Sequence, residues 1–126
     1  MTKIEDGIID INGFELSKKM TLKDFVNSSF YHQQNLDMEI FLNSEYEING
    51  HDFIISLFFK ENKLSILTLC CVDKDLKIDE EHEYERKQIH DDILKEWNIK
   101  NEYSWGTIES VYDNIGNTSG IIFSFA

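Results

Sequence analysis

The chain has 126 residues, a length that suits one folded unit, and we expect residues 1–126 to form a single domain around one core. Hydrophobic residues make up 41% and aromatic residues 13% of the sequence, which excludes a disordered acidic chain and places the charge on a folded surface. The formal net charge of -12 repels phosphate backbones and anionic membranes, so we expect neither direct nucleic-acid binding nor membrane association.

The acidic residues are concentrated toward the C-terminal end. Residues 79–126 contain 11 Asp and Glu residues against 4 Lys and Arg residues. A negative field of this kind speeds the encounter with a basic protein. It also keeps a protein soluble, and the sequence leaves both interpretations open.

The N-terminal residues and the cysteines both predict a cytoplasmic protein. Lys3 is followed by Glu5 and Asp6, and no stretch has the character of a signal peptide or a membrane span. Cys70 and Cys71 are neighbours on a predicted strand, so their side chains should point to opposite faces and stay reduced.

The first predicted element is a β-hairpin. Its strands alternate in polarity around Asn12-Gly13, a strong signal for a two-residue turn. This turn pairs Ile11 with Phe14 and Ile9 with Leu16. A short helix should follow, because Thr21 and Asp24 have the spacing of a helix N-cap.

Two further turns, Asn49-Gly50 and Glu61-Asn62, predict a three-stranded antiparallel meander. Counting outward from the first turn gives the pairs Tyr46–Phe53, Ser44–Ile55, Leu42–Leu57 and Ile40–Phe59. Counting from the second gives the pairs Phe59–Leu64, Leu57–Ile66 and Phe53–Cys70. Leu57 and Ile66 are therefore expected to be adjacent and fully buried.

The opposite face of the meander is also apolar. It is expected to hold Phe41, Ile54, Phe58, Leu67 and Leu69. Strands that are apolar on both faces are usually covered on both faces. The cover is expected to be the helices or a partner.

Residues Asp79 to Trp97 predict the longest helix. Acidic residues crowd its first turn and Lys95 lies near its end, which is the polarity that the helix dipole favours. Ile89, Ile93 and Trp97 recur every four residues and should form its buried stripe.

The chain should end in a hairpin, with one strand to about Ile115, a turn at Gly116–Gly120 and a second strand over Ile121–Phe125. The predicted element order is ββ-α-βββ-α-ββ. Such an order indicates an α+β fold, with an antiparallel sheet and two helices packed on it.

No motif for catalysis, metal binding or phosphate binding stands out. His82 and Glu83 do not begin an HExxH motif, because Arg86 occupies the place of the second histidine. His82 and His90 lie too far apart on a straight helix to share one ion. We therefore predict no catalytic residues, no metal site and no cofactor, and a protein that is not an enzyme.

The outer face of the long helix is the predicted partner-binding surface. With the apolar stripe buried, Tyr84 should stand exposed among carboxylates at 100° per residue. An aromatic anchor surrounded by charge is typical of a binding hot spot for a basic protein, although such a tyrosine can also pack on a neighbouring loop. The predicted partner-binding residues are Glu80, Glu81, Tyr84, Gln88, Asp91 and Asp92.

Two patches of the sequence give a family resemblance. The first runs from Ile11-Asn12-Gly13-Phe14 into residues 20–25, and the second from Tyr103-Ser104-Trp105-Gly106 to Asp113. Together with its small size and acidity, the chain resembles the immunity proteins of bacterial toxin systems. That resemblance implies a cytoplasmic α+β inhibitor that blocks a toxin, often a nuclease, by stoichiometric binding. It implies no catalytic residues.

Two other functions stay open. One is a phage-type acidic mimic of nucleic acid that inhibits a host defence enzyme, with carboxylates spaced like phosphates. The other is a structural or assembly module, in which the apolar second sheet face is the interface of a homodimer.

Overall fold

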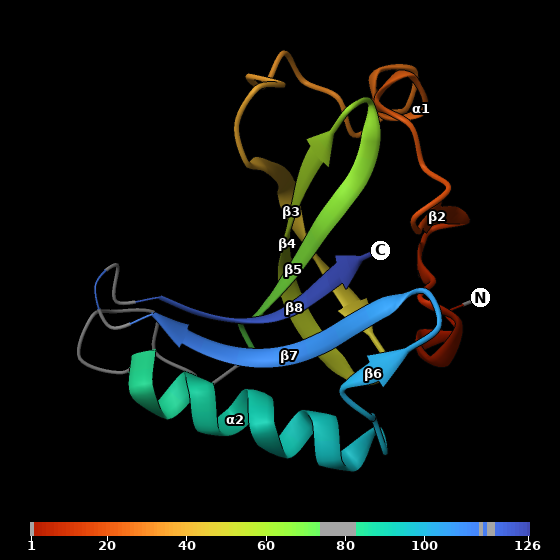
Figure 1. The fold of residues 1–126 in the computed structure, drawn as a ribbon. Helices are drawn as coiled ribbons and strands as arrows, with labels where there is room; N and C mark the ends of the chain where they lie inside the picture. The colour runs from red at the N-terminus through yellow and green to blue at the C-terminus, as the bar shows by residue number, and fades with distance from the viewer. Residues whose placement is uncertain (1, 74–82, 114, 116–117) are drawn as a thin grey trace.

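The computed structural model describes residues 2–73, 83–113, 115 and 118–126, except the side chains of Glu83 and Tyr84. Figure 1 shows an α+β fold. The elements are η1 (Ile4–Asp6), β1 (Ile9–Ile11), β2 (Phe14–Leu16), α1 (Leu22–Val26), β3 (Ile40–Ile48), β4 (His51–Lys60), β5 (Lys63–Cys71), α2 (Glu83–Glu96), β6 (Glu102–Tyr103), β7 (Gly106–Asp113) and β8 (Thr118–Phe125).

The strands form two antiparallel sheets. The first sheet pairs β1 with β2, and the second has the strand order β3-β4-β5-β8-β7-β6. The α+β class is therefore confirmed, whereas the predicted element order lacked β6 and did not separate the first hairpin from the large sheet. In Figure 1, β3, β4 and β5 run at a steep angle to β7 and β8, and α2 lies along β7 and β8.

Local turn chemistry produces the predicted hairpins. Asn49 and Gly50 both have positive φ, 47° and 94°, as a two-residue type I′ turn requires. The turns at Asn12-Gly13 and Glu61-Asn62 have the same signs of φ. Around the first turn, Ile11 pairs with Phe14 and Ile9 pairs with Leu16, as predicted.

The predicted helix start is also confirmed, because Thr21 and Asp24 form a capping box. Each side chain accepts a hydrogen bond from the other residue's backbone N–H, which satisfies two donors that the first turn leaves free. Leu22 N–H donates to the carbonyl of Asn62 at 2.9 Å, so α1 is attached to the turn between β4 and β5.

The register between β3 and β4 is right near the turn and wrong farther away. Tyr46 pairs with Phe53 as predicted, but the pairing shifts between Phe41 and Glu45, so that Ile40 opposes Leu57. The shift inserts two residues, and side chains alternate with a period of two, so Ile40 and its neighbours keep their predicted faces. The predicted pairs that this bulge removes are Ser44–Ile55, Leu42–Leu57 and Ile40–Phe59.

The register between β4 and β5 shifts by one residue. Phe59 pairs with Leu64 as predicted, but a bulge between Phe58 and Phe59 places Leu57 opposite Leu67. The predicted pairs Leu57–Ile66 and Phe53–Cys70 are therefore wrong. A one-residue slip exchanges the two faces of a strand. Leu67 and Leu69 are buried in the core, and Ile66 lies half-buried on the other face.

The inner face of α2 is more polar than its sequence pattern indicates. Arg86, His90 and Ile93 are buried, while Ile89 and Trp97 are only half-buried. The predicted stripe is thus correct at Ile93, but the helix is turned about its axis toward Arg86 and His90. The predicted start of this helix at Asp79 lies outside the described residues.

The final hairpin occupies the interior of the large sheet. Strand β8 lies between β5 and β7, and Gly120 pairs with Val111 inside the ladder. The predicted turn at Gly116–Gly120 therefore extended too far toward the C-terminus. No helix in the described part of the chain is long and apolar enough to span a membrane.

Trp105, which lies just before β7, joins the two ends of the described chain. Its ring stacks on Tyr103 with centroids 5.1 Å apart. Its indole N–H donates to the carbonyl of Glu5 at 2.9 Å. Gly7 lies so close to the ring that an added Cβ would meet it at 2.6 Å. The first residues are therefore packed against the last hairpin.

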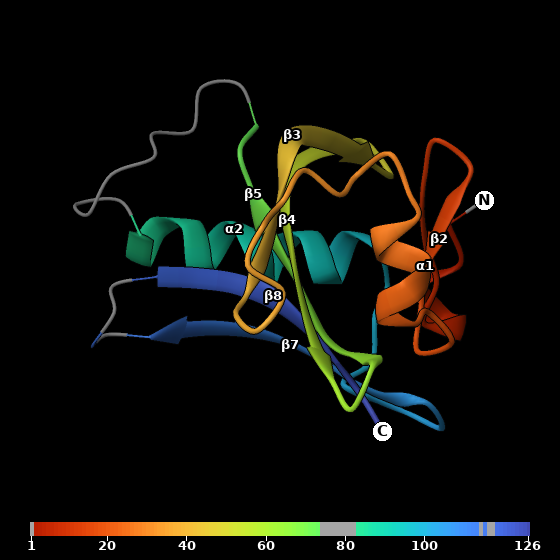
Figure 2. The ribbon, with the colours of Figure 1, turned by 90° about the horizontal axis from the view of Figure 1, so that it is seen from above.

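One face of the large sheet is open. Ile54, Phe58, Ile66 and Ile122 are half-buried there, and Phe41 has 56% of its surface exposed. Both helices contact the opposite face: α1 through Phe25 on Phe59, and α2 through its packing on β7 and β8. Among the described residues, neither helix covers the open face (Figure 2). The prediction that the helices cover this second face is therefore wrong.

Candidate functional site

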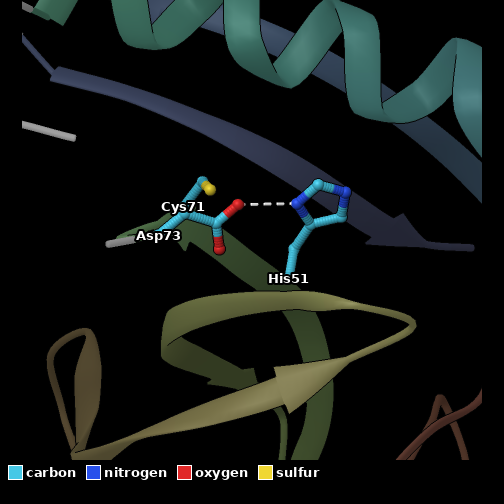
Figure 3. A group of neighbouring side chains, drawn as sticks. All are labelled: His51, Cys71 and Asp73. Carbon is cyan, nitrogen blue, oxygen red and sulfur yellow. Dashed lines mark hydrogen bonds and ion pairs between the residues drawn. The ribbon is translucent and has the colours of Figure 1, made fainter. Parts of the chain in front are cut away.

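Three separate elements bring a histidine and two carboxylates together. His51 is the first residue of β4, Asp73 follows the end of β5, and Glu96 is the last residue of α2. The strand pairing that joins Phe53 to Cys71 places His51 beside Asp73. Figure 3 shows the carboxylate of Asp73 pointing at the imidazole of His51, with Cys71 next to it.

The imidazole of His51 is bound on both sides. Its Nδ1 lies 2.7 Å from Oδ2 of Asp73, and its Nε2 lies 2.6 Å from Oε2 of Glu96. Burial alone lowers the pKa of His51, but the hydrogen bonds to Asp73 and Glu96 outweigh it and raise that pKa above 6.5. An imidazole that donates from both nitrogens is the charged form. His51 is thus a cationic link between two anions.

Asp73 is held from several directions. Burial raises its pKa, but hydrogen bonds from His51, from the backbone N–H of Asp52 and from the thiol of Cys71 together lower it. The N–H of Asp52 donates to Oδ1 at 2.6 Å. The carboxylate is therefore fixed in orientation and stays ionised.

Cys71 is buried beside this pair. Burial raises the pKa of its thiol to about 12, and the neighbouring charge of Asp73 acts in the same direction. A thiol in this state is a poor nucleophile, because the thiolate is the reactive form. The ligand atoms of His51, Cys71 and Asp73 nevertheless all lie within 4.8 Å of one another.

A second histidine fixes the same end of β5 to α2. The backbone N–H of Cys71 donates to Nε2 of the fully buried His90 at 3.0 Å. Burial, and then the charge of Arg86, lower the pKa of His90 to about 4. His90 is therefore neutral and acts as an acceptor in the core.

The predicted partner-binding residues are only partly described. Gln88 and Asp92 lie exposed on the outer face of α2 and are joined by a 3.2 Å hydrogen bond. The predicted outward position does not hold for Asp91, which is half-buried, ion-paired with Lys87 at 2.9 Å and hydrogen-bonded to Ser110 of β7. Glu80, Glu81 and the side chain of Tyr84 lie outside the described residues.

No local sequence pattern predicts the cluster of His51, Asp73 and Glu96 as a whole. His51 directly follows a predicted turn, and Asp73 follows a predicted strand. Their proximity depends on the one-residue bulge at Ser65 of β5, which brings Phe53 opposite Cys71. Glu96 belongs to a helix whose position on the sheet no local pattern predicts.

The open sheet face contains a groove of about 720 Å³. Its apolar lining includes Phe41, Ile54, Val111 and Ile122, and its charged lining consists of the exposed carboxylates of Glu39 and Asp113 and the buried Arg86 of α2. The apolar floor suits an apolar side chain of a protein or peptide partner.

The His51 link makes stability depend on pH. Because the folded-state pKa lies above 6.5, its contribution is complete below that pH and is lost as the pH rises through the folded value. In EDTA, we expect urea unfolding of the wild type to show this loss as the pH rises above about 6.5. The variant His51→Gln should lack it, whereas His32→Gln, which removes an exposed histidine, should retain it. An identical profile in His51→Gln would contradict the assignment.

Comparison with protein-family models, with curated proteins and with solved structures finds no match for this chain.

Proposed function

We propose that the chain is a small binding protein that neutralises a basic protein partner by stoichiometric binding, as the immunity proteins of bacterial toxin systems do. The observation that carries this proposal is the open apolar sheet face with its acidic border. The resemblance of the two sequence patches to immunity proteins supports the same function.

The open face has the composition of an interface core. Phe41 exposes 56% of its surface, and aromatic residues are enriched at interface centres. Phe41 adjoins the apolar side chains of the groove, and a contiguous apolar patch of this kind marks an interaction site. The groove beside Phe41 would accept an apolar side chain of the partner.

Charge selects the kind of partner. Glu39 and Asp113 border the groove, and the whole chain carries -12. A basic surface gains from this field, whereas a second copy of the chain meets like charge. Asp92, on the outer face of α2 and thus on the other side of the sheet from the groove, adds to the negative field of the whole chain.

The partner is to be identified by pull-down from the native host and by testing the product of the neighbouring gene. With the purified partner, we expect the association rate to fall steeply with added salt while the dissociation rate changes less. Asp92→Lys should lower the association rate most at low salt. Kinetics that do not respond to salt, or a chain that only self-associates, would argue against the proposal.

Two variants separate the groove from the helix. Phe41→Ala should weaken binding by about 30-fold if Phe41 is a hot spot, while Ile115→Ala, equally apolar but outside the groove, should bind like wild type. Tyr84→Ala tests the predicted anchor on α2 in the same assay. Surface changes of this kind should alter stability by less than about 0.5 kcal/mol. Full binding by Phe41→Ala together with weak binding by Tyr84→Ala would place the interface on α2.

A further inference from the structure

We propose that His51, Cys71 and Asp73 form a binding site for a zinc ion, a property independent of the proposed function. Nδ1 of His51, Sγ of Cys71 and one carboxylate oxygen of Asp73 would be the three protein ligands. They converge from the start of β4 and the end of β5, as Figure 3 shows.

The distances fit a single ion. The three ligand atoms lie within 4.8 Å of one another. Ligand atoms around a tetrahedral zinc ion, with bonds of about 2.0–2.3 Å, lie roughly 3.3–3.7 Å apart. Nδ1 and Oδ2, now 2.7 Å apart, would separate by about half an ångström as the ion replaces the shared proton. The backbone pairing between β4 and β5 need not change.

The donor set selects zinc over the common hard cations. Calcium and magnesium take oxygen ligands, whereas one imidazole nitrogen, one thiolate and one carboxylate are ligands that zinc accepts. The side chains of His51 and Asp73 are 21% and 38% exposed. Water can therefore supply the fourth ligand from the solvent side.

The surroundings of the cluster are those of a metal-binding histidine. In metal sites, the nitrogen that does not bind the ion usually donates to a carboxylate, which fixes the ring and its tautomer. Glu96 already occupies this place, 2.6 Å from Nε2. The N–H of Asp52 likewise holds the second oxygen of Asp73 at 2.6 Å. Both ligands are thus oriented before an ion arrives.

Binding must release protons. The ion displaces the proton on Nδ1 of His51 and the proton on Sγ of Cys71, because a metal ligand needs a free lone pair or a thiolate. Affinity should therefore increase with pH. At a site made of carboxylates alone, the affinity would stop increasing with pH once the carboxylates are fully ionised.

The direct test is titration of the EDTA-treated, reduced protein with ZnCl₂ and, separately, with CoCl₂. We expect one ion per chain, a rise in the thermal midpoint with zinc, and a near-ultraviolet thiolate-to-cobalt absorption band. Affinity should increase between pH 6 and pH 8. Absence of one-to-one binding at micromolar ion concentration, or cobalt binding without a thiolate band, would overturn the site.

The neighbouring cysteine supplies a matched control. Cys70→Ser alters a half-buried thiol on the opposite face and should leave binding and the cobalt band intact. Cys71→Ser should abolish the band. Asp73→Asn removes one of the three ligands at a partly exposed position, so it tests metal binding without disturbing the core. Loss of the band in Cys70→Ser with retention in Cys71→Ser would contradict the assignment.

Glu96 tests the orienting contact. Its side chain is 59% exposed, so Glu96→Ala should fold normally. Removal of such a partner typically lowers metal affinity by about 10–100-fold. Zinc affinity equal to that of wild type would show that Glu96 does not position His51 for the ion.

Discussion

Leu57→Ala is expected to lower the free energy of unfolding by roughly 2–5 kcal/mol, which is the range for a large side chain removed from a packed core. Leu57 is fully buried and lies between Ile40 of β3 and Leu67 of β5. Both neighbouring strands are held in register, so the cavity cannot close easily. Chemical denaturation of the wild type and the variant, fitted with one common m-value, measures the loss in free energy of unfolding.

Ile66→Ala is the matched control for this register. Ile66 pairs with Phe58 and lies half-buried on the open face. Ile66→Ala should therefore lower the free energy of unfolding by at least about 1 kcal/mol less than Leu57→Ala does. Equal losses for the two variants would mean that Ile66 shares the core with Leu57. The bulge between Phe58 and Phe59 would then be absent in solution.

Gly106→Ala is expected to destabilise the fold by about 3 kcal/mol or more, from two sources that add. Gly106 has a φ of 151°, which other residues rarely adopt, and an added Cβ would overlap the backbone carbonyl of Ser124. Strand β8 is central in the sheet and cannot move aside. Thermal and urea unfolding both measure this loss.

Gly50→Ala separates the two sources. Gly50 also has a positive φ, 94°, but nothing lies within 4 Å of the position of its Cβ. Its replacement should cost only the backbone strain, about 1–2 kcal/mol. A Gly106→Ala variant no less stable than Gly50→Ala would show that β7 and β8 pack less closely at Gly106.

Short-range chemistry explains which parts of the fold the sequence predicts. The turns at Asn12-Gly13 and Asn49-Gly50 and the cap at Thr21 depend on residues within four positions of one another. These features therefore appear in the sequence and are confirmed in the structure. The same locality makes the α+β class predictable.

The bulges mark where local reasoning fails. The extra residue opposite Phe58 and Phe59 is Ser65 of β5, and no glycine or turn residue marks the shift. Both faces of β4 are apolar, so neither register buries many more apolar residues than the other. Contacts with the rest of the fold must therefore decide between the two registers.

The candidate metal cluster was missed for a related reason. Its ligands are 20 and 22 residues from His51, on different strands, and no motif spacing describes them. Likewise, Arg86 and His90 are polar residues that a hydrophobic pattern assigns to the surface of α2, yet both are buried. The cost of burying them is met by contacts such as the one from Cys71 N–H to His90.

The contact of Trp105 with Glu5 spans 100 residues of chain. During synthesis on the ribosome, the residues around Gly7 therefore emerge long before the ring that covers them exists. At typical rates this delay is about 5–20 s. The segment around Glu5 and Gly7 must wait through this interval without the ring that covers it, and its docking on Trp105 is a late event in folding.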